Sequence, residues 1–162
     1  MDEGRGMREE GRATSGEGRG ASDEAPPGEV KKARLQWVGG MRFDAGPADG
    51  AHVIRVDGDN ETGPGPMTTL LLAIAGCTGA DVASILEKMR VRLQEFSIEI
   101  AGTRRVQEPR RYMSVHLVFR LRGEGLDEPR ARRAIDLSIQ KYCSVMHSLA
   151  ADLRITYELA LG

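Results

Sequence analysis

Residues 67–90 read MTTLLLAIAGCTGADVASILEKMR, and this stretch decides what the rest of the chain must build around it. Drawn as a helix, its first half is apolar on nearly every side, whereas its second half becomes charged and ends in cations. This pattern is typical of a helix that is buried on most sides rather than one lying on a surface. Thr68 or Thr69 is suited to cap its start, and Lys88 and Arg90 suit the negative end of the helix dipole.

Strands are expected on both sides of this helix, because short apolar and β-branched runs alternate there with turn residues. Gly39-Gly40 marks a turn, and the strands around it resemble an antiparallel meander. Asp127 is placed to cap a second helix, with Pro129 in its first turn and an apolar stripe that continues to Leu149. The expected strands cover residues 33–38, 41–44, 52–56, 95–101, 112–121 and 154–161. The order βββ-α-ββ-α-β lacks regular βαβ alternation and therefore indicates the α+β class.

The first 28 residues differ in composition from everything that follows. They are rich in Gly, Glu, Arg and Ser and contain no Leu, Ile, Val or aromatic residue. A segment with so little apolar surface cannot offset the entropy lost on ordering. We therefore expect residues 1–28 to be a disordered tail and residues 29–162 to form one domain.

The bulk properties exclude several classes of partner. The chain of 162 residues has a formal net charge of −1, which gives no reason to expect nucleic acid or an anionic membrane surface. One Trp, three Tyr and three Phe offer little for stacking of bases. No apolar run approaches the roughly 18 residues of a membrane span, and the N-terminus lacks the apolar core of a signal peptide. We expect a cytoplasmic protein, whose thiols stay reduced unless a redox cycle uses them.

Metal and cofactor motifs are absent from the sequence. The chain has two cysteines and three histidines (His52, His116 and His147) without the spacing of a zinc site. Cys143 and His147 are four residues apart on one helix face, but two ligands rarely make a site. The acidic stretch 57–61 lacks the glycine and glutamate positions of a calcium loop. We expect no metal and no cofactor.

Each cysteine can be interpreted in two ways. Cys77 lies in the apolar helix, and Cys143 lies in the second helix within QKYCSVMHSL, residues 140–149. A single cysteine in an apolar helix is usually a small buried hydrophobe, and burial raises its pKa and makes it inert. Alternatively, the fold brings the two thiols together for redox chemistry. Composition alone favours the first interpretation.

The segments around both cysteines resemble those of the OsmC/Ohr family, the osmotically inducible and organic hydroperoxide resistance proteins. The resemblance rests on Gly65-Pro-Met67, on residues 70–90 around Cys77, and on KYCSVMHSL at residues 141–149. It extends from about Val30 to the C-terminus and is closer to the OsmC-like branch. The resemblance implies an intertwined homodimer, in which two central Cys-bearing helices pack against antiparallel sheet.

The resemblance also implies a chemistry. By analogy, Cys77 is the peroxidatic residue, which attacks an organic hydroperoxide and becomes a sulfenic acid. Cys143 then acts as the resolving residue and forms a disulfide with it. An external dithiol restores both thiols.

In the family an arginine from the N-terminal strands stabilises the thiolate, and a glutamate just before the first cysteine holds that arginine. Arg42 is the best match for the arginine and Arg34 the second. The glutamate is missing, because no acidic residue lies between Glu61 and Cys77. Glu61 is the substitute that the loop offers, and Asp81 is a further carboxylate that could hold the arginine.

Three functions remain open from the sequence. The first is a thiol-dependent hydroperoxide reductase with an apolar pocket lined by Met67, Leu71, Ile74 and Met146. The second, motivated by the missing glutamate, is a small-molecule-binding protein of the same fold with a non-catalytic site. The third is a structural domain with two buried thiols.

Overall fold

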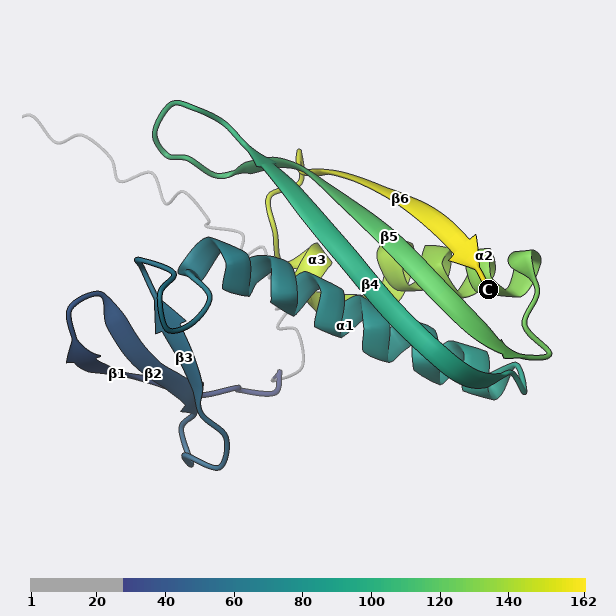
Figure 1. The fold of residues 1–162 in the computed structure, drawn as a ribbon, viewed down its shortest axis with the longest axis horizontal. Coiled ribbons are helices and arrows are strands. Elements are labelled where there is room, and N and C mark those ends of the chain that lie inside the picture. Colours follow the sequence, from purple (N-terminus) through teal and green to yellow (C-terminus); the bar gives the residue numbers. More distant parts are fainter. Residues whose placement is uncertain (1–27) are drawn as a thin grey trace, which may run out of the picture. The chain divides into compact units, whose positions relative to one another are not determined.

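The computed structural model describes residues 28–162, so the expected tail at residues 1–28 lies almost wholly outside the described residues. The chain divides into two units, Met1–Lys31 and Lys32–Gly162, and every helix and strand described here belongs to the second. The elements in chain order are β1 (Ala33–Gly39), β2 (Arg42–Pro47), β3 (Ile54–Asp57), α1 (Pro66–Lys88), β4 (Arg92–Arg104), β5 (Tyr112–Glu124), α2 (Glu128–Leu137), η1 (Ser138–Tyr142), α3 (Ser144–His147) and β6 (Arg154–Leu161) (Figure 1). The α+β class is confirmed.

Two three-stranded sheets make up the β structure, ordered β1-β2-β3 and β4-β5-β6. The first is an antiparallel meander, as expected. In the second, β4 and β5 pair antiparallel but β5 and β6 pair parallel. The expectation of purely antiparallel sheet is therefore wrong at β6. The reason is that α2 and α3 carry the chain back along the sheet before β6 begins, as a parallel connection requires.

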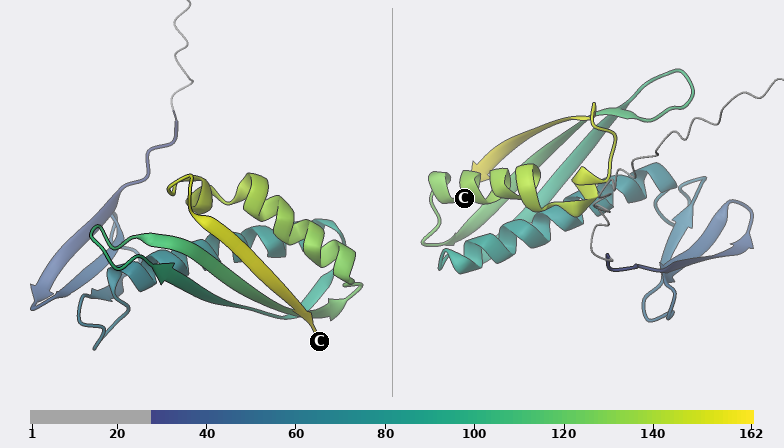
Figure 2. Two further views of the ribbon diagram at one scale, coloured as in Figure 1. Left: turned by 90° about the horizontal axis from the view of Figure 1, so that it is seen from above. Right: turned by 180° about the vertical axis from the view of Figure 1, so that it is seen from behind.

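The core lies between the second sheet and the helices that cover it. Figure 2 shows α1 and α2 on the same face of this sheet. α1 contributes a stripe of fully buried residues at helical spacing, Ile74, Thr78, Val82 and Leu86. β5 contributes the alternating residues Val115, Leu117, Phe119 and Leu121. The opposite face of the sheet is polar and carries ion pairs such as Arg120–Glu99 and Arg122–Glu95.

Helix α1 begins differently from the sequence-based expectation. Its N-cap is Gly65, which makes no side-chain capping bond, and Pro66 occupies the first helical turn. Thr69 instead lies inside the helix and donates its hydroxyl to the Gly65 carbonyl at 3.0 Å. Proline suits the first turn because its missing N–H has no helical partner there. The expected caps at Thr68 and Thr69 are therefore wrong, whereas Asp127 does cap α2 by accepting from the Arg130 backbone N–H.

The second helix is divided into three pieces, which the sequence pattern did not predict. A π-helical turn, η1, follows α2, and Cys143 then adopts an extended conformation with φ −67° and ψ 92° before α3 begins. A π turn contains one more residue than an α turn and is frequent at functional sites. Cys143 consequently lies at a break between helices rather than inside one.

Helix α1 is also more apolar than the sequence analysis allowed. An 18-residue window within Pro66–Lys88 has a mean hydropathy of 1.8, which corrects the statement that no run approaches a membrane-spanning length. The core helix of a soluble protein passes the same test. Only 22% of this window is buried within the chain itself. Most of the other residues of α1 are partly buried, and one side of the helix, at positions 72, 73, 76, 80 and 84, stays exposed among the described residues.

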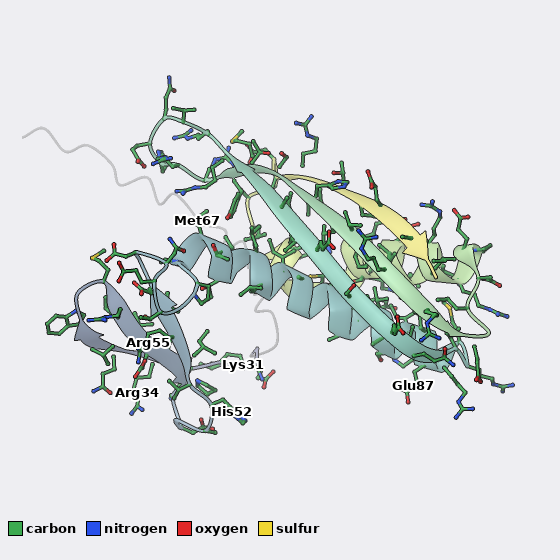
Figure 3. All side chains as sticks on the ribbon, in the orientation of Figure 1. Lys31, Arg34, His52, Arg55, Met67 and Glu87 are labelled. Carbon is green, nitrogen blue, oxygen red and sulfur yellow. The ribbon has the colours of Figure 1, made fainter. Side chains whose placement is uncertain are left out.

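The first sheet shares this exposure. The hydrophobic core cluster of residues 28–162 contains no residue from β1, β2 or β3. Large apolar side chains on this sheet are open to solvent, among them Leu35, Trp37 and Ile54, which are 59%, 65% and 53% exposed. Isolated small sheets of this kind are marginal in water. Figure 3 shows Arg34 and Arg55 projecting from the first sheet, and Met67 and Glu87 at opposite ends of α1.

Candidate functional site

The fold brings the two cysteines together. Cys77 lies in the middle of α1, and Cys143 lies at the break between η1 and α3. The sulfur atoms of both cysteines and one carboxylate oxygen of Asp81 all lie within 4.8 Å of one another. The three residues come from two segments that are far apart in sequence, so only the packing of α1 against the α2–α3 segment creates the cluster. Both thiols are free.

Cys143 is the buried member of the pair, with a relative exposure of 0%. Burial raises the pKa of its thiol, and the contact with Cys77 raises it further. The hydroxyl of Thr78 donates to the sulfur at 3.5 Å and acts in the opposite direction, as does a bond from the Met146 backbone. Cys143 is therefore held mainly as a thiol at neutral pH.

Cys77 is the accessible member, since its side chain is only partly buried. It occupies α1 one residue before the buried Thr78, so the two side chains that contact Cys143 come from adjacent positions. Asp81 follows one turn later, on the same side of the helix as Cys77. The Ser138 hydroxyl donates to Asp81 Oδ2 at 2.9 Å and fixes the direction of this carboxylate.

The expected arginine and glutamate are not joined to this cluster in the described chain. Arg42 lies in β2 and donates its Nε to the Gly39 carbonyl at 3.2 Å, within the β1–β2 turn. Glu61 is exposed in the loop between β3 and α1. Within residues 28–162, neither side chain forms an ion pair with the other. Their roles, and that of Arg34 on β1, stay predictions.

A separate apolar cavity opens near the start of α1. It has a volume of about 370 Å³, within the usual range for small-molecule sites. Its lining comprises Met67, Leu70, Arg104, Pro109, Arg110, Arg111, Tyr112, Leu149, Ala150 and Leu153. Of the four residues expected to line a pocket, only Met67 does so here. Ile74 of α1 and Met146 of α3 are instead buried in the core.

Thr78 and Ser138 were missed by the sequence analysis. Thr78 directly follows Cys77, and Ser138 lies five residues before Cys143, but serine and threonine are common in helices and carry no signal by themselves. Their importance follows from burial, since both are 0% exposed and a buried hydroxyl must find a partner. They find Cys143 and Asp81.

The arrangement of a long Cys-bearing helix, two small sheets and a second cysteine after the other helix agrees with known proteins. The family model described as OsmC-like protein matches residues 58–158, which include both cysteines. The chain belongs to the OsmC-like family.

Relatives of this OsmC-like chain extend over most of its length. It is 37% identical over 127 residues to protein YhfA of Escherichia coli, covering 78% of this chain and 94% of YhfA. A crystal structure of a hypothetical protein from Aquifex aeolicus superposes with a TM-score of 0.71 at 29% identity, covering 83% of this chain and 98% of that one. The organic hydroperoxide resistance protein OhrB of Bacillus subtilis superposes with a TM-score of 0.56 at 14% identity, covering 82% and 98%, which shows a shared fold.

Proposed function

We propose that this OsmC-like protein is a thiol-dependent peroxidase that reduces organic hydroperoxides, with Cys77 as the peroxidatic and Cys143 as the resolving cysteine. The single observation that carries the proposal is the cluster in which the two sulfurs lie within 4.8 Å of each other. The fold supports the same assignment, because several proteins that share it are named organic hydroperoxide resistance proteins.

The reaction proceeds in two steps. The Cys77 thiolate attacks the terminal oxygen of the hydroperoxide, the O–O bond breaks, and the leaving alkoxide takes a proton to become an alcohol. Cys77 is then a sulfenic acid. In the second step the Cys143 sulfur attacks the Cys77 sulfur, the S–O bond breaks, and the hydroxyl leaves as water with the proton of Cys143. An external dithiol reduces the resulting disulfide by exchange.

Burial supports this division of roles. The peroxidatic sulfur must meet the substrate, and Cys77 is the more accessible of the two. The resolving sulfur must wait until a sulfenic acid has formed, and the raised pKa of Cys143 keeps it protonated and unreactive until then. The cytoplasm contains the reductants that can regenerate the two thiols. We therefore place the protein there, as part of the defence against oxidative stress.

The cation that stabilises the Cys77 thiolate belongs to the proposal as well. We assign this role to Arg42, with Glu61 as its acidic partner. Support comes from the chain itself, because Arg42 lies on the exposed first sheet, which a second copy of the chain would cover. In a homodimer of that kind, Arg42 of one protomer can stabilise the Cys77 thiolate of the same protomer or of its partner.

The proposal predicts two distinct phenotypes for the cysteines. Cys77→Ser abolishes dithiol-dependent consumption of cumene hydroperoxide, because no other thiol can attack the peroxide. Cys143→Ser preserves the first step and leaves a sulfenic acid at Cys77. Mass spectrometry after one equivalent of peroxide detects the intramolecular disulfide in the wild type and a dimedone adduct at Cys77 in Cys143→Ser. Full turnover by Cys77→Ser would contradict the assignment.

The apolar cavity favours a second candidate function, the binding of a small molecule without turnover. Arg104, Arg110 and Arg111 surround an otherwise apolar lining, which suits an amphipathic carboxylate. Arg111 already pairs with Asp152 at 2.5 Å, which leaves Arg104 and Arg110 to meet the ligand. Calorimetry with octanoate, using Leu70→Asp as the blocked variant, tests this function. Tight binding by a wild type that is inert toward several peroxides would favour it over the peroxidase.

A further inference from the structure

The cluster of Cys77, Asp81 and Cys143 has the composition of a metal site as well as of a thiol pair. We propose that these residues bind a divalent zinc ion in the reduced protein. Two sulfurs and one carboxylate oxygen form the donor set, and all three atoms lie within 4.8 Å of one another. Cysteine thiolates and carboxylates are both ordinary zinc ligands, and thiolates select zinc over magnesium or calcium.

The backbone holds the three donors in positions that suit zinc. Cys77 and Asp81 are four residues apart on α1, the spacing that brings two side chains to the same face of a helix. Cys143 reaches them from η1 and α3, where the extended backbone at the helix break turns its sulfur toward α1. A tetrahedral zinc ion with Zn–S bonds of about 2.3 Å holds two sulfurs about 3.8 Å apart. The two sulfurs already lie within 4.8 Å of each other. They need to approach by about 1 Å or less to bind the same zinc ion.

The surroundings of Asp81 are those of a ligand rather than of a structural ion pair. Ser138 donates to Oδ2 at 2.9 Å, so one carboxylate oxygen is anchored and the other is left to bind. Such anchoring by a neighbouring hydrogen bond is usual for metal-ligating carboxylates. Among residues 28–162, no lysine or arginine forms an ion pair with Asp81. Zinc binding releases the thiol protons, and the divalent charge of the ion then offsets the repulsion between the two thiolates and this carboxylate.

The sequence analysis expected no metal and set aside a pairing of Cys143 with His147. In the structure His147 is exposed on α3 whereas Cys143 is fully buried. The third ligand comes instead from α1. With three protein ligands, the fourth zinc position stays open to water or a small anion, as in catalytic and regulatory zinc sites.

Zinc binding and thiol oxidation exclude each other at this site, because both use the same sulfur electron pairs. Oxidation of the loaded site by an organic hydroperoxide balances as two zinc-bound thiolates plus ROOH and two protons giving the disulfide, Zn²⁺, ROH and water. This release step rests on the proposed function, whereas binding of zinc to the reduced protein does not. The ion therefore protects the pair at low peroxide and is released when peroxide rises.

Binding is tested with the full chain, reduced and freed of metal. Titration with Co²⁺ is expected to produce a thiolate-to-cobalt charge-transfer band that saturates at one ion per chain and is displaced by Zn²⁺. Asp81→Asn keeps the side-chain size and is expected to weaken Zn²⁺ binding by at least 10-fold, measured by competition with a chromophoric chelator. Ser138→Ala removes the hydroxyl that anchors the Asp81 carboxylate and is expected to weaken Zn²⁺ binding about 10-fold or more. The matched control Asp136→Asn changes a carboxylate that instead accepts from Tyr157 and is expected to leave binding unchanged.

Two outcomes overturn the zinc site. One is the absence of a charge-transfer band in reduced wild type whose circular dichroism shows it to be folded. The other is equal Zn²⁺ affinity in wild type and Asp81→Asn. Peroxidase failure is distinguishable from either, because the Co²⁺ titration uses no peroxide. A protein that binds Zn²⁺ but does not turn over peroxide would keep the site and refute the release step.

Discussion

Thr78 shows how a single hydroxyl group affects the pKa of Cys143, the proposed resolving cysteine. Thr78 directly follows Cys77 and is buried in the core. Its hydroxyl donates to Cys143 Sγ at 3.5 Å. The bond favours the thiolate of Cys143 and so lowers a pKa that burial raises. Helix α1, which carries Cys77, therefore also lowers the pKa of the Cys143 thiol through Thr78.

Replacing Thr78 by Val removes this donor at nearly constant volume. The pKa of Cys143 is then expected to rise further, because only the bond from the Met146 backbone still opposes the effect of burial. Disulfide closure after a peroxide pulse should become slower at neutral pH, and its pH profile should move to higher pH. Acid quenching followed by mass spectrometry across a pH series measures this.

The control for this prediction is Thr103→Val, which changes an exposed threonine on β4 that does not bond to either cysteine. It should leave the pH profile unchanged. An unshifted profile in Thr78→Val would mean that ionisation of Cys143 does not limit closure.

At the scale of elements, the loop between β3 and α1 determines where α1 begins. Asp57 is buried at the end of β3 and accepts from the Thr62 backbone N–H at 2.9 Å, the Thr62 hydroxyl at 2.8 Å and the Asp59 N–H at 3.0 Å. These bonds lower the pKa of the Asp57 carboxyl. The acidic stretch 57–61 is thus a turn, and the carboxylate of Asp57 accepts the hydrogen bonds that hold it.

The lowered pKa makes the loop sensitive to acid. A carboxyl with a lower pKa in the folded state contributes stability that is fully present above its unfolded value, about 3.9, and is lost as pH falls through the folded value. Asp57→Asn should therefore lower the melting temperature at pH 7 and flatten its dependence on pH below about 4. Differential scanning calorimetry across pH 2–7 compares it with Asp59→Asn, a neighbouring exposed aspartate that should retain the wild-type slope.

The break after α2 acts at the same scale. If residues 138–147 continued as one α-helix, Cys143 would lie within a regular stripe, as its sequence pattern indicates. The π turn η1 and the extended backbone at Cys143 instead interrupt that stripe at the cysteine. The position of the Cys143 thiol therefore depends on an irregularity of the backbone rather than on helical periodicity.

At the scale of the whole molecule, the exposed apolar surface requires a partner, and we propose a second copy of the chain. Along one side of α1 the exposed residues are mostly small, at positions 72, 73, 76 and 80. Leu72 is 54% exposed there, and a Cβ added at Gly76 would meet nothing within 4 Å. Small residues permit the close approach of two helices, and a self-complementary two-fold interface covers such a face in both copies.

Substitution of Gly76 by Glu separates a dimer from a monomer. In a monomer the new side chain clashes with nothing and should stabilise α1 by about 1 kcal/mol through helix propensity. In a dimer packed through this face it buries a charge in the interface and should cause dissociation and a lower melting temperature. Light scattering with size exclusion measures the mass.

Val106→Glu is the control, since Val106 is 89% exposed in the loop between β4 and β5. It should leave the oligomeric state as it is in the wild type. A monomeric wild type, or a dimer that survives Gly76→Glu, would refute this interface.

Local patterns were sufficient for much of the fold. The sequence alone predicted the α+β class, the long apolar helix, the cap at Asp127 and the bounds of β6, because each depends on periodicity or on a neighbouring residue's chemistry. It also predicted Cys77 and Cys143 as the site residues, and this assignment stays a prediction. These properties need no knowledge of what lies across the core.

Tertiary structure alone decided everything that requires contact between distant segments. It brought Cys143 to Cys77 and Asp81, made β6 parallel to β5, and turned Thr78 and Ser138 into hydrogen-bond donors of the site. Whether a thiol is accessible or buried, and whether a carboxylate is paired or free, depends on what packs against it. The sequence thus predicted the two cysteines as the residues of interest, and the packing of α1 against the α2–α3 segment decided that they lie together with Asp81.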